Sequence, residues 1–237
     1  MTFEEWLGDF TAEIDRRAAR GEPDWAAGAR MHPAIVRSVQ RFQLGEAGDG
    51  ANLIAKSGGG AYGDAVKLFI DEERNHARML AELLGAAQAS TITGHWSDAV
   101  FVRLRRALGL RMELMVLSIA EVVALAYYRS LRDGTTDPLT TEVAGRLLAD
   151  ERRHVPFHRD RLRAFGSLPW LARHLWHLMF LGAVLVVALD HGSALKVLGR
   201  TRWSFIREAR VEFAVASDLR GAPGPGERAA PTAILSR

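Results

Sequence analysis

The strongest constraint in this sequence is the placement of acids and imidazoles within otherwise apolar helical seams. Four long stretches carry apolar residues at alternating steps of three and four, the spacing of helices packed in a bundle. Each seam has an ionisable residue near its centre. The seams are Ile35, Val39, Phe42, Glu46, Asp49, Leu53; Tyr62, Val66, Phe69, Glu73, His76, Leu80, Leu83; Leu110, Leu114, Leu117, Glu121, Ala124, Tyr128, Leu131; and Ala144, Leu147, Glu151, His154, His158, Phe165.

These inward ionisable groups need a common explanation. A charged carboxylate in a low-dielectric core is very costly unless it is paired, protonated or bound to a metal ion. The chain contains no cysteine, which excludes disulfides, thiolate zinc sites, iron–sulfur clusters and cysteine nucleophiles. Any metal site must therefore be built from Asp, Glu and His.

The turns between the seams set the inward acids at matching heights. The SGGG turn at 57–60 lies about midway between Glu46 and Glu73, and the DGTTDP turn lies nearly midway between Glu121 and Glu151. Because a helix rises about 1.5 Å per residue, an antiparallel hairpin brings the two acids of each pair to one level.

A pentapeptide is nearly repeated in the second and fourth seams. EERNH ends at His76, and DERRH ends at His154, 78 residues later. In each copy the histidine follows a glutamate by three residues, which places both side chains on one helix face. The sequence therefore predicts six inward oxygen and nitrogen donors at one level, which are Glu46, Glu73, His76, Glu121, Glu151 and His154.

Helix breakers divide the rest of the chain, and no run alternates as a strand would. We therefore expect an all-α protein. Thr2 and Glu5 have capping-box spacing, and Pro33 suits a helix N-terminus. The predicted helices span about 2–20, 32–56, 61–85, 98–132, 139–165, 170–190 and 193–218. The predicted divisions are a peripheral helix at 1–31, a four-helix bundle at 32–166, a helical extension at 167–218 and a disordered tail at 219–237.

The charge of the chain argues against nucleic acid as a partner. The 31 basic and 28 acidic residues nearly balance, and the net charge of +3 is diffuse. The opening MTFEEWLGDF is acidic and has no apolar segment typical of a secretory signal. We therefore expect a cytoplasmic protein.

The constellation resembles the ferritin-like superfamily, whose di-iron and di-manganese carboxylate bundles use one Glu from each of two helices and Glu-x-x-His from each of the others. The superfamily includes bacterioferritin, rubrerythrin and the ribonucleotide reductase small subunit, and the resemblance covers about residues 32–166. It implies two iron ions, with manganese or a mixed pair as alternatives. It also implies bridging by Glu73 and Glu151, terminal carboxylates at Glu46 and Glu121, and one metal for each of His76 and His154.

Two details bear on how well the chain matches the superfamily's ligand pattern. The interval from Glu46 to Glu73 is 27 residues, a few shorter than the superfamily usually shows. Glu113 competes with Glu121 for the third helix, but its row also contains Arg106 and is less apolar. We therefore favour Glu121.

Other interpretations of single motifs remain open. One Glu-x-x-His alone is common on a solvated helix face, whereas two matched copies are not. Arg74 and Arg152, inside the two copies, either support the site by pairing with acids such as Asp71 or Glu72, or form surface salt bridges.

Three further residues near the predicted site have more than one interpretation. His158 follows His154 by one turn, just after Pro156, and is an additional metal ligand, a proton shuttle or a hydrogen-bonded core histidine; we favour the last. Tyr127 and Tyr128 have a radical or hydrogen-bonding role or pack in the core, and we favour packing.

The apolar segment at 170–190 also needs an interpretation. Its uninterrupted apolar part, Leu178 to Leu189, is shorter than the roughly 20 residues of a membrane span. We expect a buried fifth helix or a homodimer contact. Trp170, Trp176 and nearby basic residues would also suit peripheral contact with a membrane surface.

The resemblance implies a di-iron oxidoreductase that activates dioxygen or peroxide to oxidise a small organic substrate. The alternative is ferritin-type iron oxidation, storage or metal handling, although the segments flanking the bundle would encumber a compact cage. A bundle that keeps inward charges for specificity alone is the weakest interpretation. Because the chain has no cysteine, an oxidoreductase of this kind needs an external electron donor. Fold alone does not identify the reaction.

Overall fold

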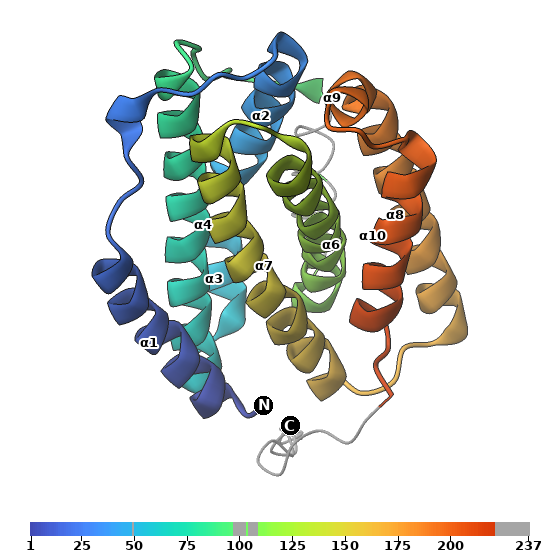
Figure 1. Ribbon diagram of the computed structural model, residues 1–237. Coiled ribbons are helices and arrows are strands. Elements are labelled where there is room, and N and C mark those ends of the chain that lie inside the picture. The colour runs from blue at the N-terminus through green and yellow to red at the C-terminus, as the bar shows by residue number, and fades with distance from the viewer. Residues whose placement is uncertain (49, 97–102, 104–108, 221–237) are drawn as a thin grey trace, which may run out of the picture.

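The computed structural model describes residues 1–48, 50–96, 103 and 109–220. This part of the chain is helical, with no strand, which confirms the all-α prediction (Figure 1). The helices α1, α2, α3, α4, α6, α7, α8, α9 and α10 span Phe3–Arg20, Pro33–Glu46, Ala51–Ser57, Gly60–Ala86, Leu110–Gly134, Pro138–Ala164, Trp170–Asp190, Gly192–Val197 and Arg202–Ala216, and a short 3-10 turn, η1, spans Trp25–Ala27.

The centre of the molecule is formed by four packed columns, namely α4, α6, α7 and the pair α2 and α3. The helices α6 and α7 form a hairpin and share the most extensive packing, while α2 and α3 pack along α4, and α4 contacts α7. Their buried apolar side chains join those of the flanking helices in one continuous core. The four columns therefore enclose the level at which the inward acids were predicted to meet.

The first central column differs from the prediction because it is interrupted. The single helix expected over 32–56 ends at Glu46 as α2 and restarts at Ala51 as α3. Gly50 lies between them with a left-handed φ of 65°, and a Cβ there would lie 2.5 Å from the Ile70 side chain. Only glycine fits this conformation and this close approach. The break makes Glu46 the last residue of its helix.

The other boundaries follow the predicted punctuation. The SGGG segment separates α3 from α4, and Gly58 and Gly60 both have a φ of 75°. Asp137 caps α7 by accepting a hydrogen bond from the Thr140 backbone, and Pro138 is the first helical residue. The third central helix differs, because it was expected to run unbroken from Asp98, whereas α6 begins at Leu110 after Gly109, whose backbone is extended. Residues 97–102 and 104–108 lie outside the described residues.

The N-terminal helix lies against the central columns on one side. The capping box of Thr2 and Glu5 is confirmed. Trp6 and Phe10 are buried, and both rings make edge contacts with Phe157 of α7, at centroid distances of 5.7 and 5.1 Å. The first helix is therefore anchored to α7 close to the second pentapeptide.

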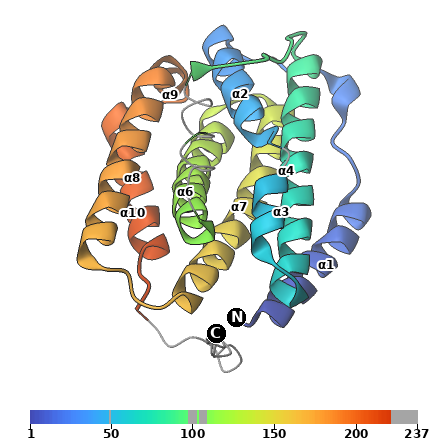
Figure 2. The same cartoon turned by 180° about the vertical axis from the view of Figure 1, so that it is seen from behind.

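The C-terminal helices cover the opposite side, on α6 and α2 (Figures 1 and 2). The prediction of two helices is corrected to three, because the second expected helix stops at Val197 and restarts at Arg202. Gly199 has a φ of 72°, and Thr201 and Ser204 form a new capping box. A fresh N-cap thus starts α10 where one long helix was expected. The predicted disordered tail lies mostly outside the described residues.

The prediction of a buried fifth helix is wrong for α8. Its inner face, Trp176, Phe180, Val184 and Ala188, is buried, but its outer face is exposed and apolar. The exposed leucines are Leu171, Leu175, Leu178, Leu181, Leu185 and Leu189. The helix is also long and apolar enough to cross a membrane by length and composition alone, with 22% of its apolar window buried, which corrects the expectation from the shorter run. A homodimer contact and a membrane surface remain predictions.

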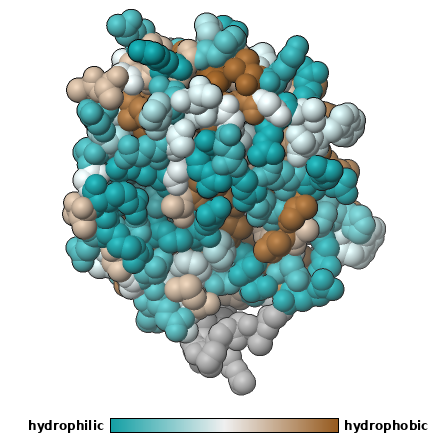
Figure 3. Space-filling model, in the orientation of Figure 1, coloured by the Kyte–Doolittle hydropathy of each residue, from teal (hydrophilic) through white to brown (hydrophobic). Residues whose placement is uncertain are grey.

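The face seen in Figure 1, over α7 and its neighbours, has a different character. It is mostly hydrophilic, and its hydrophobic side chains form small separate patches (Figure 3). The run of exposed leucines on α8 is therefore not typical of this face.

Candidate metal centre

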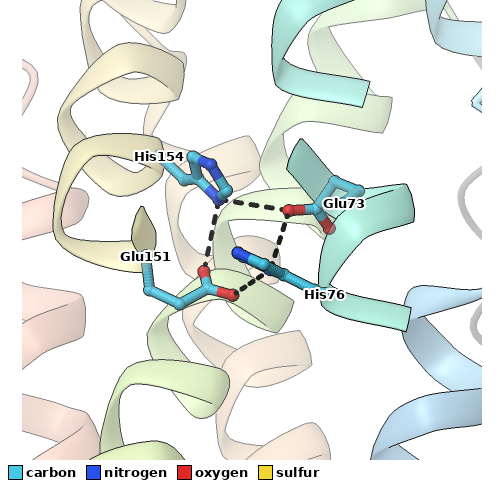
Figure 4. A group of neighbouring side chains, drawn as sticks. All are labelled: Glu73, His76, Glu151 and His154. Carbon is cyan, nitrogen blue, oxygen red and sulfur yellow. Dashed lines mark ion pairs between the residues drawn. The ribbon is translucent and has the colours of Figure 1, made fainter. Parts of the chain in front are cut away.

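The two copies of Glu-x-x-His meet in the core between α4 and α7. Glu73 and His76 come from α4, and Glu151 and His154 come from α7; their side chains point toward one another (Figure 4). One ligand atom from each residue lies within 4.8 Å of the others, so this group could hold a metal ion. Residues 78 positions apart in the sequence thus form one cluster.

Each glutamate of the cluster lies between both imidazoles. The Nδ1 atom of His154 is 3.1 Å from Oε1 of Glu73 and 3.5 Å from Oε2 of Glu151. The Nδ1 atom of His76 is 3.6 Å from Oε1 of Glu73 and 3.5 Å from Oε1 of Glu151. This crossed arrangement suits carboxylates that bridge two ions, because each one faces both nitrogen ligands.

The inward atoms of the cluster lack hydrogen-bond partners. These atoms are Nδ1 of His76, Nδ1 of His154, Oε1 of Glu73 and Oε2 of Glu151, and all four are buried. Buried polar atoms in folded proteins almost always have a partner, so each exception needs an explanation. Carboxylate oxygens and imidazole nitrogens without sulfur form a donor set that suits iron or manganese. The residues present therefore fit a metal centre.

The outer nitrogens of both imidazoles are held by acids from the opposite helix. Nε2 of His76 lies 3.1 Å from Oδ2 of Asp150, and Nε2 of His154 lies 2.8 Å from Oε2 of Glu72. Each of these acids begins the pentapeptide that contains the other histidine. Such a carboxylate fixes the ring orientation and leaves the other nitrogen available as a ligand.

Two arginines neutralise this outer pair of acids. Arg17 of α1 lies 2.6 Å from Glu72 and 3.1 Å from Asp150, and Arg153 lies 2.8 Å from each. The buried acids are therefore not isolated charges. They form a shared ion-pair network behind both histidines.

Of the two interpretations of Arg74 and Arg152, the structure supports a surface salt bridge for Arg74 and does not turn either side chain toward the site. Arg74 pairs with Asp71 at 2.9 Å on the surface, and Arg152 is exposed. The arginine beside His154 in the DERRH copy, Arg153, is the one that turns inward. The sequence does contain a related signal, because an acid begins each pentapeptide, Glu72 in one and Asp150 in the other. In the structure both acids are buried.

Glu121 lies beside the cluster, whereas its competitor Glu113 does not. Oε2 of Glu121 is 3.4 Å from Nδ1 of His154. Glu113 instead accepts hydrogen bonds from Asn52 at 2.7 Å and Lys56 at 2.9 Å. Both acids are buried in α6, two turns apart, so burial alone does not separate them.

Glu46 lies beside the site at the C-terminal end of α2. It is half-buried at the end of α2, and the hydroxyl of Tyr128 donates a hydrogen bond to its Oε1 atom at 2.5 Å. Burial, together with the negative charges of Glu73 and Glu151, raises the pKa of Glu46 well above its usual range. Glu46 therefore shares the electrostatic field of the cluster. Tyr127, in contrast, stacks on Phe42 at a centroid distance of 3.7 Å, as expected for core packing.

The pKa values describe a site that attracts positive charge. Burial and the neighbouring Glu121 carboxylate raise the pKa of Glu151 to about 8. Burial lowers the pKa of His76 and of His154, but the surrounding carboxylates outweigh it and raise both pKa values well above the usual range. Protons and metal ions compete for such donors, so metal binding releases protons.

No protein-family model, curated protein or solved structure matches this chain. What the site does is therefore inferred from its own residues and their geometry. Its donors, their burial and their unsatisfied atoms are the observations that bear on function.

Proposed function

We propose that this protein is a ferritin-like di-iron carboxylate oxidoreductase, which uses dioxygen or peroxide to oxidise a small organic substrate. One observation carries the proposal: two Glu-x-x-His motifs from separate helices converge with four inward ligand atoms that have no hydrogen-bond partner. A structural role alone would leave these atoms unsatisfied at a cost in stability.

The charge of the cluster supports two divalent ions rather than one. Six carboxylates surround the site, those of Glu46, Glu72, Glu73, Glu121, Asp150 and Glu151. Two guanidinium groups, from Arg17 and Arg153, offset two of these charges. With neutral imidazoles, four negative charges remain, which is the charge that two divalent cations balance. The more distant acids Asp9 and Glu13 have a further partner in Arg16.

The positions of the ligands suggest how they would be shared. Glu73 and Glu151 each face both imidazoles and would bridge the two ions. His76 and His154 would each bind one ion. Glu46 and Glu121, at opposite sides of the cluster, would complete the two ends.

When bound there, two iron ions would supply the electrons that reduce dioxygen or peroxide. The chain's own residues would control protons and water around them. The Tyr128 hydroxyl donates its proton in a hydrogen bond to Oε1 of Glu46, and Asp150 and Glu72 hold the outer nitrogens of the histidines. The buried walls exclude bulk water, which protects reactive oxidising species. Electrons must come from an external donor, because no cysteine is present to hold an iron–sulfur centre.

Anaerobic reconstitution tests the proposal. The metal-free protein is titrated with ferrous iron, the metal bound per chain is counted, and absorbance is followed after oxygen is added. We expect two irons per chain and a transient absorption band that decays faster with substrate. Glu73→Ala and Glu151→Ala should abolish binding of both ions, whereas Asp71→Asn, a change at an exposed acid of α4, should not.

The outcomes separate this function from its alternatives. Absence of bound metal in the wild type, or unchanged binding in both alanine variants, would contradict the proposed site. Iron accumulating far beyond two per chain, in an assembly that elutes as a large shell in gel filtration, would favour iron storage instead.

A further inference from the structure

His158 is a buried imidazole that the rest of the structure does not satisfy. It lies on α7 with Glu151 and His154 at spacings of i, i+3 and i+7, which place the three on one face. Its side chain is fully buried, and neither ring nitrogen has a hydrogen-bond partner. The favoured sequence interpretation, a hydrogen-bonded core histidine, is therefore wrong.

The surroundings of His158 leave one direction for a polar interaction. The rings of Phe69 and Phe157 flank it, at centroid distances of 4.7 and 5.4 Å. Nε2 faces Glu121, with 3.7 Å to Oε1, which is too long for a hydrogen bond. Among the described residues this is the only ion-pair contact found for His158. The imidazole thus points from an apolar wall toward the carboxylate at the end of the cluster.

Comparison of the two motifs shows that packing does not require a histidine here. The offset of 78 residues that relates His76 to His154 also relates Leu80 to His158. Leu80 is fully buried on α4 and fills the equivalent place with an apolar side chain. A leucine would therefore suffice for the core, and the imidazole needs another explanation.

We propose that His158 is a third nitrogen ligand, which binds through Nε2 to the ion held by Glu121 and His154. Two ligand atoms of one ion, each about 2.1 Å from it, can lie up to about 4.2 Å apart. The 3.7 Å between Nε2 of His158 and Oε1 of Glu121 falls within this limit. This inference rests on the proposed function.

The extra ligand makes the two metal positions different. The position beside Glu121, His154 and His158 is enclosed by buried side chains, of which Glu121 is 4% exposed. The position beside Glu46 and His76 would have one imidazole ligand rather than two. Fewer protein ligands beside Glu46 and His76 would leave more room there for dioxygen or water, whereas Glu121, His154 and His158 would hold the other ion more completely.

Stepwise titration with cobalt(II) tests this assignment without any turnover. The wild type should bind two ions in two steps of different affinity. His158→Leu, which reproduces the residue found at position 80, should weaken the tighter step about tenfold or more and alter its visible absorption bands. His158→Gln provides a second variant in case leucine impairs folding. His191→Gln is the matched control, because His191 is buried but contacts Ser38 rather than the cluster.

A measurement on the unaltered chain gives an independent result. Pulsed electron paramagnetic resonance of the manganese(II)-loaded protein, with and without 15N-labelled histidine, counts the nitrogen ligands. Two histidine nitrogens on one ion and one on the other are expected. One on each ion, or unchanged cobalt binding and spectra in both His158 variants, would overturn the proposal. A wild-type chain that binds no pair of ions would instead overturn the proposed function itself.

Discussion

The two halves of the site contain the same motif but surround it differently. In the half formed by α2 and α4, the terminal acid Glu46 sits at a helix end that is half-buried. In the half formed by α6 and α7, Glu121 lies inside an unbroken helix and is buried. The second half also has His158 where the first has Leu80. A repeated motif can thus form one enclosed half and one accessible half.

The difference between the halves begins in the backbone. Gly50, with its left-handed φ and its contact with Ile70, ends the regularity of the first column just after Glu46. No such break occurs in the described part of α6. The hydrogen bond from Tyr128 of α6 to Glu46 then connects the helix-end acid of the first half to the second half. The following variants test how far the two halves are independent.

The largest effect on stability is expected for Arg153→Met. Arg153 contacts both Glu72 and Asp150, and its loss leaves Arg17 as the one guanidinium group found beside these two buried acids among the described residues. We expect the free energy of unfolding to fall by about 2–4 kcal/mol, measured by urea denaturation of the metal-free protein. Arg74→Met, at an exposed pair with Asp71, should change it by less than about 0.5 kcal/mol. Equal effects of the two substitutions would show that the buried ion pairs stabilise the fold no more than the exposed pair does.

The next largest effect should appear when the acid that supports the histidine of the opposite helix is replaced. Asp150 lies on α7 but contacts His76 of α4, and Glu72 lies on α4 but contacts His154 of α7. Asp150→Asn should lower the affinity for the ion held by His76 by roughly 10–100-fold. Glu72→Gln should lower the affinity for the ion held by His154 by a similar factor. Stepwise cobalt titration should therefore show that the two variants alter different steps. If both alter the same step, the crossed support is refuted.

A pH dependence should distinguish the metal-free from the metal-loaded site. Burial and Glu121 raise the folded-state pKa of Glu151 to about 8, so the folded chain binds a proton that the unfolded chain releases near its ordinary pKa. The raised pKa values of His76 and His154 act in the same direction. Stability of the metal-free protein should therefore fall as pH rises from about 5 to 8, by about 1.4 kcal/mol per pH unit for each extra proton bound.

Metal should suppress this dependence, because it replaces those protons. Urea unfolding at several pH values, with and without bound manganese, measures both slopes. Glu151→Gln should flatten the slope of the metal-free protein, since its amide does not titrate. A metal-free stability that rises over the same pH range would contradict the assignment of Glu151.

The smallest effect is expected at the bond that joins the halves. Tyr128→Phe removes the hydroxyl that donates to Glu46 and should lower the free energy of unfolding by about 0.5–1.5 kcal/mol. A double-mutant cycle with Glu46→Gln isolates this interaction. Additive effects of the two substitutions would show that the bond contributes nothing in solution.

Much of the fold was predictable because it depends on local patterns. The seam spacing identified the inward faces, and Thr2, Pro33 and the SGGG turn marked boundaries that the structure confirms. The convergence of the two pentapeptides followed from helix rise and turn position. These features need only the residue sequence and the geometry of one helix or hairpin.

The features that escaped prediction depend on contacts between distant segments. Arg17 reaches Asp150 across 133 positions of sequence, and no periodicity connects them. The turn inward of Arg153 rather than Arg152 depends on where Glu72 lies on the neighbouring helix. The exposure of the α8 leucines depends on how many helices cover that side. A seam shows which face is apolar, but it does not show which partner lies against it.

The crossed support of the histidines has a consequence for how the protein is made. The first pentapeptide emerges from the ribosome 78 residues before the second, which at roughly 5–20 residues per second is a delay of about 4–16 s. During that time His76 lacks its partner Asp150, and Glu73 lacks Glu151 and His154. The nascent chain thus cannot complete the cluster until its second half has been synthesised and docked. If the cluster holds metal as proposed, the ions are bound only after the chain can enclose them.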